Sequence, residues 1–170
     1  MSNSSIVRKA KNKIIREFIK DKQIIEAINS SEVNSNEPEK LIGKHIFDYN
    51  QNPHTLNMVG TFITIQVHIP EPYYGGYHSS AIHVEPRIEI WVISHERHMV
   101  VDNVPKVTQN RNDYLSEIID RKINGKSGLG IGETKLLSNI EGSFQADYLF
   151  RKMVFKCLDL NKSLCEDEDE

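Results

Sequence analysis

The chain has 170 residues, of which 38% are hydrophobic and 26% are charged, and its formal net charge at pH 7 is −3. This length suits one domain with a substantial buried core, and the small net charge argues against bulk binding of nucleic acid. Two cysteines, Cys157 and Cys165, are too few for a secreted disulfide framework. The sequence shows no signal peptide and no apolar run that could span a membrane, so we expect folding in a reducing cytoplasm.

Charged residues are distributed unevenly along the chain. Residues 8–22 are rich in lysine and arginine, and residues 166–170 are all acidic. Blocks of like charge are usually solvated faces or tails. We therefore expect residues 1–161 to form one α+β domain and residues 162–170 to be a disordered acidic tail.

The N-terminal part of the chain predicts one long amphipathic helix over residues 5–29. Its apolar residues recur at helical spacing, and lysines and arginines occupy the other face. The polar segment Ser30–Lys40 then predicts a loop. The apolar segment Leu41–Tyr49 is expected to pack under a sheet.

Two strands are predicted in the middle of the chain. In Thr61–Ile69, apolar and polar residues alternate, which is typical of a strand with one buried face. Arg87–His95 has apolar residues on both faces and is expected to be a central, well-covered strand. Between them, Pro70 and Pro72 end the first strand, and Tyr73–Ser80 predicts a hairpin tip or loop.

The remaining elements are a helix and two strands. Asn112–Ile123 predicts a helix with Asn112 as its N-cap and Gly125 just beyond its C-terminus. A short strand at residues 135–137 and a long one at residues 148–158 follow. The order of elements predicts an α+β fold, with an antiparallel or mixed sheet of about four strands and helices packed on one face.

Possible chemistry is limited to weak signals. The glycines between residues 125 and 132 follow a helix and precede a strand, which is the wrong context for a nucleotide-binding loop. His95 and His98 could bind a metal as part of a small metal-dependent hydrolase, but their only adjacent carboxylate is Glu96. We therefore expect no catalytic residues, no metal and no cofactor, and keep the hydrolase as an alternative.

Two features are candidates for contacts with other macromolecules. The basic N-terminal helix could form a nucleic-acid-binding module, although stacking aromatics are not interleaved with its lysines. Alternatively, Arg16 and Lys20 could face an acidic surface of a neighbouring subunit. Tyr73, Tyr74 and Tyr77 surround two glycines on a predicted projection, and such rigid amphipathic side chains are good interface anchors.

The second half of the chain resembles the small tail-terminator and neck proteins of tailed bacteriophages. The resemblance covers about residues 60–161 and lies in the order of elements, with no catalytic signature. It rests on the strand Ile88–His95 followed by Arg111-Asn112-Asp113, the helix Asn112–Ile123, the step Leu129-Gly130-Ile131-Gly132, the strand near Lys135–Ser138, and the ending Phe155-Lys156-Cys157-Leu158-Asp159-Leu160-Asn161.

This resemblance implies a virion structural protein that forms a ring of identical subunits, a hexamer, and has no catalytic activity. The ring would contact the tail tube and the head-connector or neck proteins and would lie near the DNA channel. It implies no membrane and no specific nucleic acid as partner. Assembly would take place in the host cytoplasm.

Overall fold

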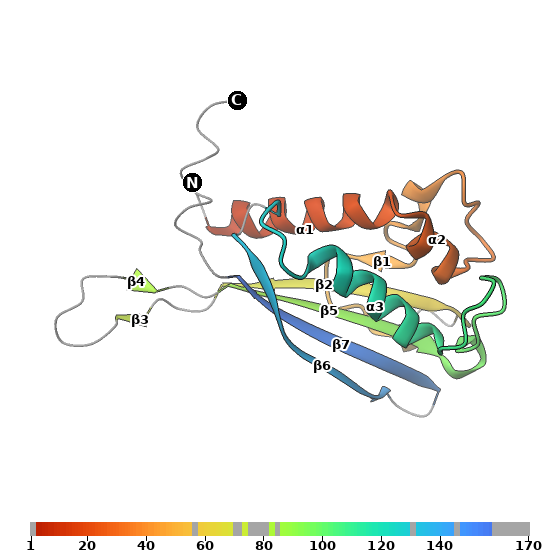
Figure 1. Cartoon of the computed structure of the whole chain (residues 1–170). Helices are drawn as coiled ribbons and strands as arrows, with labels where there is room; N and C mark the ends of the chain where they lie inside the picture. The colour runs from red at the N-terminus through yellow and green to blue at the C-terminus, as the bar shows by residue number, and fades with distance from the viewer. Residues whose placement is uncertain are drawn as a thin grey trace.

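The computed structural model describes residues 3–55, 58–69, 73–74, 82–83, 86–129, 132–144 and 147–157. In this part of the chain, helices lie on one face of a mixed sheet, as Figure 1 shows. The helices are α1 (Asn3–Ile19), α2 (Lys22–Ile28) and α3 (Arg111–Ile123). The sheet has five strands, which are in spatial order β1 (Ile46–Phe47), β2 (Thr61–His68), β5 (Arg87–His95), β7 (Tyr148–Cys157) and β6 (Thr134–Phe144).

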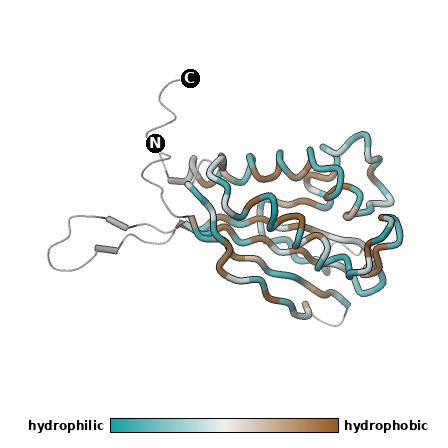
Figure 2. The backbone as a smooth tube through the Cα atoms, viewed as in Figure 1, coloured by the Kyte–Doolittle hydropathy of each residue, from teal (hydrophilic) through white to brown (hydrophobic). Residues whose placement is uncertain are grey.

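The core lies between the helices and the sheet. Alternate residues of the three inner strands are buried there, against the apolar stripes of all three helices. They are Ile63, Ile65, Val67, Ile88, Ile90, Val92, Met153, Phe155 and Cys157. Figure 2 shows hydrophobic segments along the strands, and hydrophobic and hydrophilic residues alternating along α1 and α3. The expected α+β class with helices on one face of a mixed sheet is confirmed.

The expected long N-terminal helix is wrong, because the chain forms two helices. Lys20 and Asp21 separate α1 from α2, and the backbone of Asp21 is extended, with φ −90° and ψ 111°. The carboxylate of Asp21 accepts hydrogen bonds from the backbone N–H groups of Gln23 and Ile24, at 2.8 and 3.3 Å. The second helix therefore begins with its own N-cap. None of the described helices is long and apolar enough to cross a membrane.

The strands differ from the expectation at both edges of the sheet. The apolar segment near Leu41 contains β1, which pairs in parallel with β2 and makes five strands where about four were expected. At the other edge β6 is 11 residues long, whereas only residues 135–137 were predicted. The strands predicted at residues 61–69, 87–95 and 148–158 are confirmed, and β5 is central.

The helix predicted at Asn112–Ile123 is confirmed as α3, but its N-cap is a different residue. Asn110, and not Asn112, accepts the backbone N–H of Asp113 at 2.9 Å. Gly125 lies just beyond the helix with φ +71°, a left-handed conformation that glycine adopts without strain.

A short antiparallel pair lies between β2 and β5 in the sequence. Here β3 (Tyr73–Tyr74) pairs with β4 (Ile82–His83), and Figure 1 shows the pair beyond the end of the main sheet. The predicted projection is thus a two-stranded arm. The acidic tail, residues 162–170, lies outside the described residues.

Replacing Asp21 by alanine is expected to lower the free energy of unfolding by about 1 kcal/mol, because α2 loses its N-cap. Asp21 also pairs with Lys122 of α3 at 2.8 Å. Asp21→Asn is the matched control, because asparagine caps equally well but removes the ion pair. Urea denaturation followed by circular dichroism would measure both variants. An alanine variant as stable as the wild type would contradict the capping role.

Candidate functional site

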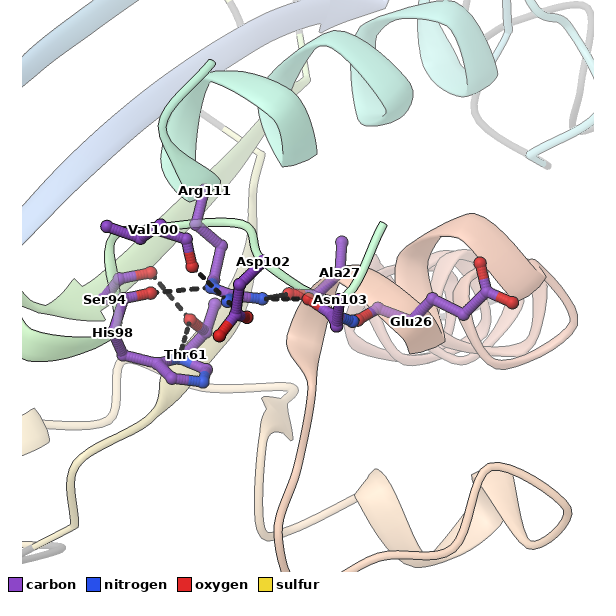
Figure 3. A network of polar contacts seen from close by, with 9 residues as sticks. All are labelled: Glu26, Ala27, Thr61, Ser94, His98, Val100, Asp102, Asn103 and Arg111. Carbon is purple, nitrogen blue, oxygen red and sulfur yellow. Dashed lines mark hydrogen bonds and ion pairs between the residues drawn. The ribbon is translucent and has the colours of Figure 1, made fainter. Parts of the chain in front are cut away.

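The most elaborate polar cluster surrounds Arg111, the first residue of α3, which is 1% exposed. Its guanidinium donates hydrogen bonds to three backbone carbonyls, at 2.5 Å to Ala27, 2.6 Å to His98 and 2.5 Å to Val100. Figure 3 shows the side chain pointing away from α3, between the end of α2 and the segment that follows β5. One side chain therefore joins three separate parts of the chain.

Two neighbours complete this cluster. Asn103 accepts from Arg111 at 3.5 Å and donates its own side-chain N–H to the carbonyl of Glu26 at 2.6 Å. The carboxylate of Asp102 lies 3.9 Å from the guanidinium. Burial lowers the pKa of Arg111, and Asp102 opposes this shift, but an arginine remains protonated in proteins. The guanidinium thus has partners within the chain on all three of its nitrogens, and the cluster stabilises the fold.

The two histidines considered for a metal have other partners. His98 lies 2.9 Å from the hydroxyl of Thr61, which is 2.8 Å from that of Ser94. His95 accepts the backbone N–H of Arg97 at 3.1 Å, and its ring contacts Tyr148 edge to face at 5.1 Å. Across the described ranges, no group of three or more His, Cys, Asp or Glu side chains is placed to hold a metal ion. The geometry does not bring the two histidines together as ligands.

The face of the sheet opposite the helices has an aromatic centre. Trp91 of β5 packs against Phe150 of β7, with ring centroids 4.7 Å apart. The indole N–H donates to Glu89 at 2.6 Å, and the ammonium of Lys152 lies 4.8 Å from the indole centroid and 3.0 Å from the Glu89 carboxylate. Trp91 and its three partners are half-buried. β5 is thus a central strand that is covered on both faces, fully on the helical face and partly around Trp91 on the other, as the sequence predicted.

One end of this face is more fully packed than the centre. Phe47, Phe62, Ile93 and Tyr148 form a second buried cluster there. Next to it, the ring of Phe150 lies so close to Gly142 that a Cβ on this glycine would be 2.7 Å from the ring. A larger residue at this position would require the Phe150 ring to move, so glycine allows the ring to lie over β6 here.

The edge strand β6 exposes apolar residues. A bulge between Leu136 and Ser138 interrupts its pairing with β7. Leu137, within the bulge, is 48% exposed, and Ile140 is 52% exposed. The side chain of Asn124 accepts the backbone N–H of Leu136 at 3.0 Å, so the loop after α3 covers the start of the strand. No second strand among the described ones pairs with the outer side of β6.

The opposite edge of the sheet carries a cleft of about 300 Å³ between α1 and β1. Its lining includes Ile42 and Tyr49, whose exposed fractions are 45% and 50%. Arg16, one of the predicted interface residues, also lines this cleft. Lys20 is exposed nearby on the same chain segment and pairs with Glu17 at 3.7 Å. The sequence therefore identified one residue of the cleft but not the cleft itself.

The structure describes only part of the three tyrosines that were predicted as interface anchors. Tyr73 and Tyr74 form β3 in the arm, but their side chains are not among those described, and Tyr77 lies outside the described residues. Their role at an interface stays a prediction.

A further cleft of about 310 Å³ lies between the start of α3, β6 and β7. Its main charged group is already paired, since the guanidinium of Arg151 contacts Asp113 at 2.6 Å and Glu141 at 3.5 Å. Asn112 lines this cleft too, and its side-chain N–H donates to the carbonyl of Leu149 at 2.9 Å. These contacts attach α3 to β7.

Comparison with known protein families gives one match. The model of the YomW family matches residues 20–157, which is most of the chain. The chain therefore belongs to the YomW family, named after a protein from a Bacillus phage region. No curated protein matches it.

Substitution of Arg111 is expected to destabilise the fold strongly. Arg111→Met would leave several buried carbonyls without a donor and should cost about 3 kcal/mol or more. Arg111→Lys should also be destabilising, because an ammonium group lacks the planar set of N–H donors with which the guanidinium binds several carbonyls. The exposed Arg97 of the neighbouring 3-10 helix provides the control, Arg97→Met. Chemical denaturation would contradict this role if Arg111→Met matched the control.

Acid is expected to destabilise the protein through His98. Burial, followed by the charge of Arg111, lowers the pKa of His98 from 6.5 to about 4. The unfolded chain then binds the proton more readily, so this contribution to stability is complete above pH 6.5 and is lost as the pH falls toward 4. Melting temperatures between pH 7 and 4 should show a weaker pH dependence in His98→Gln. An NMR titration giving His98 an ordinary pKa would contradict the prediction.

Proposed function

We propose that this protein is a structural subunit of a phage virion, a ring-forming tail terminator or neck subunit that joins the tail to the head. Its partners would be further copies of itself, the tail tube and the head-connector proteins. In this role it needs no cofactor and carries out no reaction. A closed ring, which the resemblance suggests is hexameric, would cap the tail tube and present its other face to the connector.

The observation that carries this proposal is the open face of the main sheet. In the described part of the chain, the α-helices pack on the opposite face only. The open face keeps Trp91 and Phe150 half-buried beside the charged pair of Glu89 and Lys152. Half-buried aromatic side chains with a charged rim are typical of protein–protein interfaces.

The family and the shape of the chain give further support. The YomW match agrees with a phage origin. The arm of β3 and β4 extends beyond the sheet and could reach a neighbouring subunit, as the tyrosines suggested. Arg111 and His98 make hydrogen bonds within the chain, which is consistent with a role in the fold. Together these features favour assembly over catalysis.

The purified protein is expected to have a mass that is a multiple of the 19.6 kDa of one chain. Light scattering and native mass spectrometry over a range of concentrations would measure it. A mass of one chain at the highest concentration would contradict ring formation.

The open face can be tested with Trp91→Thr, which retains a good strand former. This variant should fold, by circular dichroism, but bind the tail tube or connector at least tenfold more weakly if burial of the indole contributes at least about 1.4 kcal/mol. Val100→Thr is the matched control, since Val100 is the most exposed of the large hydrophobic residues and lies outside the sheet. Equal binding by both variants would exclude the open face as a docking surface.

A further inference from the structure

We propose that copies of this chain associate head to tail, with the exposed part of β6 in one copy packing into the cleft between α1 and β1 of the next. This inference rests on the proposed ring and specifies its subunit contact. It involves two surfaces that the sequence did not identify as a pair.

The positions of the two surfaces favour this mode of association. β6 and β1 are the two ends of the same five-stranded sheet, so the surfaces lie on opposite sides of the molecule. A contact between two different surfaces leaves one of each free after every addition, and it forms a closed ring when the rotation between copies permits closure. A contact of β6 with β6 would instead end at a dimer.

The apolar character of the two surfaces matches. Leu137 and Ile140 are about half exposed on β6, and Ile42 and Tyr49 are about half exposed at the cleft. These are four of the six large hydrophobic residues that are exposed in the described part of the chain. Burying such side chains is favourable by roughly 25 cal/mol per Å² of apolar surface. Their concentration at two opposite edges indicates surfaces that become covered.

The two surfaces carry a small excess of opposite charge. Near the cleft, Lys13 and Arg16 of α1 and Lys20 just beyond it are exposed, against the exposed Glu17 and against Asp48, which lines the cleft. On the other edge, Glu133 is exposed just before β6, and Glu141 is exposed on β6, where it pairs with Arg151 at 3.5 Å. Lys135 reduces the negative charge of this edge but does not reverse it. Such complementarity selects the partner surface and its register more than it adds affinity.

The start of β6 limits where the contact can form. Thr134 exchanges backbone hydrogen bonds with the loop after α3, donating to Lys126 at 3.0 Å and accepting from Gly125 at 2.7 Å. The side chain of Asn124 accepts a hydrogen bond from the backbone N–H of Leu136. The part of the edge available to a neighbour therefore begins at Leu137, where the bulge lies and an apolar side chain is about half exposed.

Two surface variants test the contact. Ile140→Lys alters the β6 edge, and Ile42→Lys alters the cleft, while each leaves the other surface intact. Each variant alone should lose the higher mass of the wild type and remain monomeric by light scattering. Mixed in equal amounts they should form a dimer that grows no further, because one intact β6 edge meets one intact cleft. Val100→Lys, which is exposed outside both surfaces, should assemble like the wild type.

Different failures have different meanings. If the wild type assembles and either variant assembles equally well, or if the mixture stays monomeric, the head-to-tail contact is wrong but the ring survives. If the wild type itself is monomeric, both proposals are overturned. Circular dichroism would establish that each variant is folded, and Leu137→Lys with Tyr49→Lys provides a second pair at the same surfaces.

Discussion

The hydrogen bonds of the buried Arg111 guanidinium determine how the helical layer is built. The segment between β5 and α3 has little regular structure, so its buried carbonyls lack the partners that a strand or helix would supply. One guanidinium provides five N–H donors in a fixed plane and can serve several carbonyls at once. Arg111 does this for His98 and Val100, and it also reaches Ala27 at the end of α2. These hydrogen bonds fix the start of α3 relative to α2 and β5, in addition to the packing of α3 on the sheet.

The position of α3 then determines the orientation of the rest of the sheet. Asp113, in its first turn, contacts Arg151 at 2.6 Å, and Asn112 donates to the backbone of Leu149, so both hold β7. Lys122, in its last turn, holds the cap of α2 through Asp21. Because all three described α-helices pack on one face of the sheet, the opposite face is covered only by the side chains of its own strands and of nearby described segments. Trp91, Phe150 and Lys152 give it partial cover, and all three side chains remain half-buried.

The sequence predicted the elements whose apolar residues recur periodically and missed those whose apolar residues do not. Apolar and polar residues alternate along β2 from Ile63, burial alternates along β5 and the second half of β7, and α3 has a full apolar stripe. The break before α2 was missed because the apolar stripe continues across it, although Asp21 has the residue type of an N-cap. β6 was underestimated because its more buried positions include Thr134, Ser138 and Gly142, so its burial alternates without an alternation of apolar residues in the sequence. Arg111 was noted only as part of a resemblance, since its burial depends on carbonyls far away in the sequence.

The proposed subunit contact also involves residues whose positions could not be predicted from the sequence. Ile42 and Leu137 are ordinary apolar residues in the sequence, and only the strand order shows that they mark opposite edges of one sheet. Neither residue contributes to the cluster that builds the core. In the proposed assembly, stability of the single chain and formation of the ring depend on different residues, the first on Arg111 and the buried strands, the second on the two edges. A subunit organised in this way would fold completely before it meets a neighbour, as the proposed ring, which adds one copy at a time and then closes, requires.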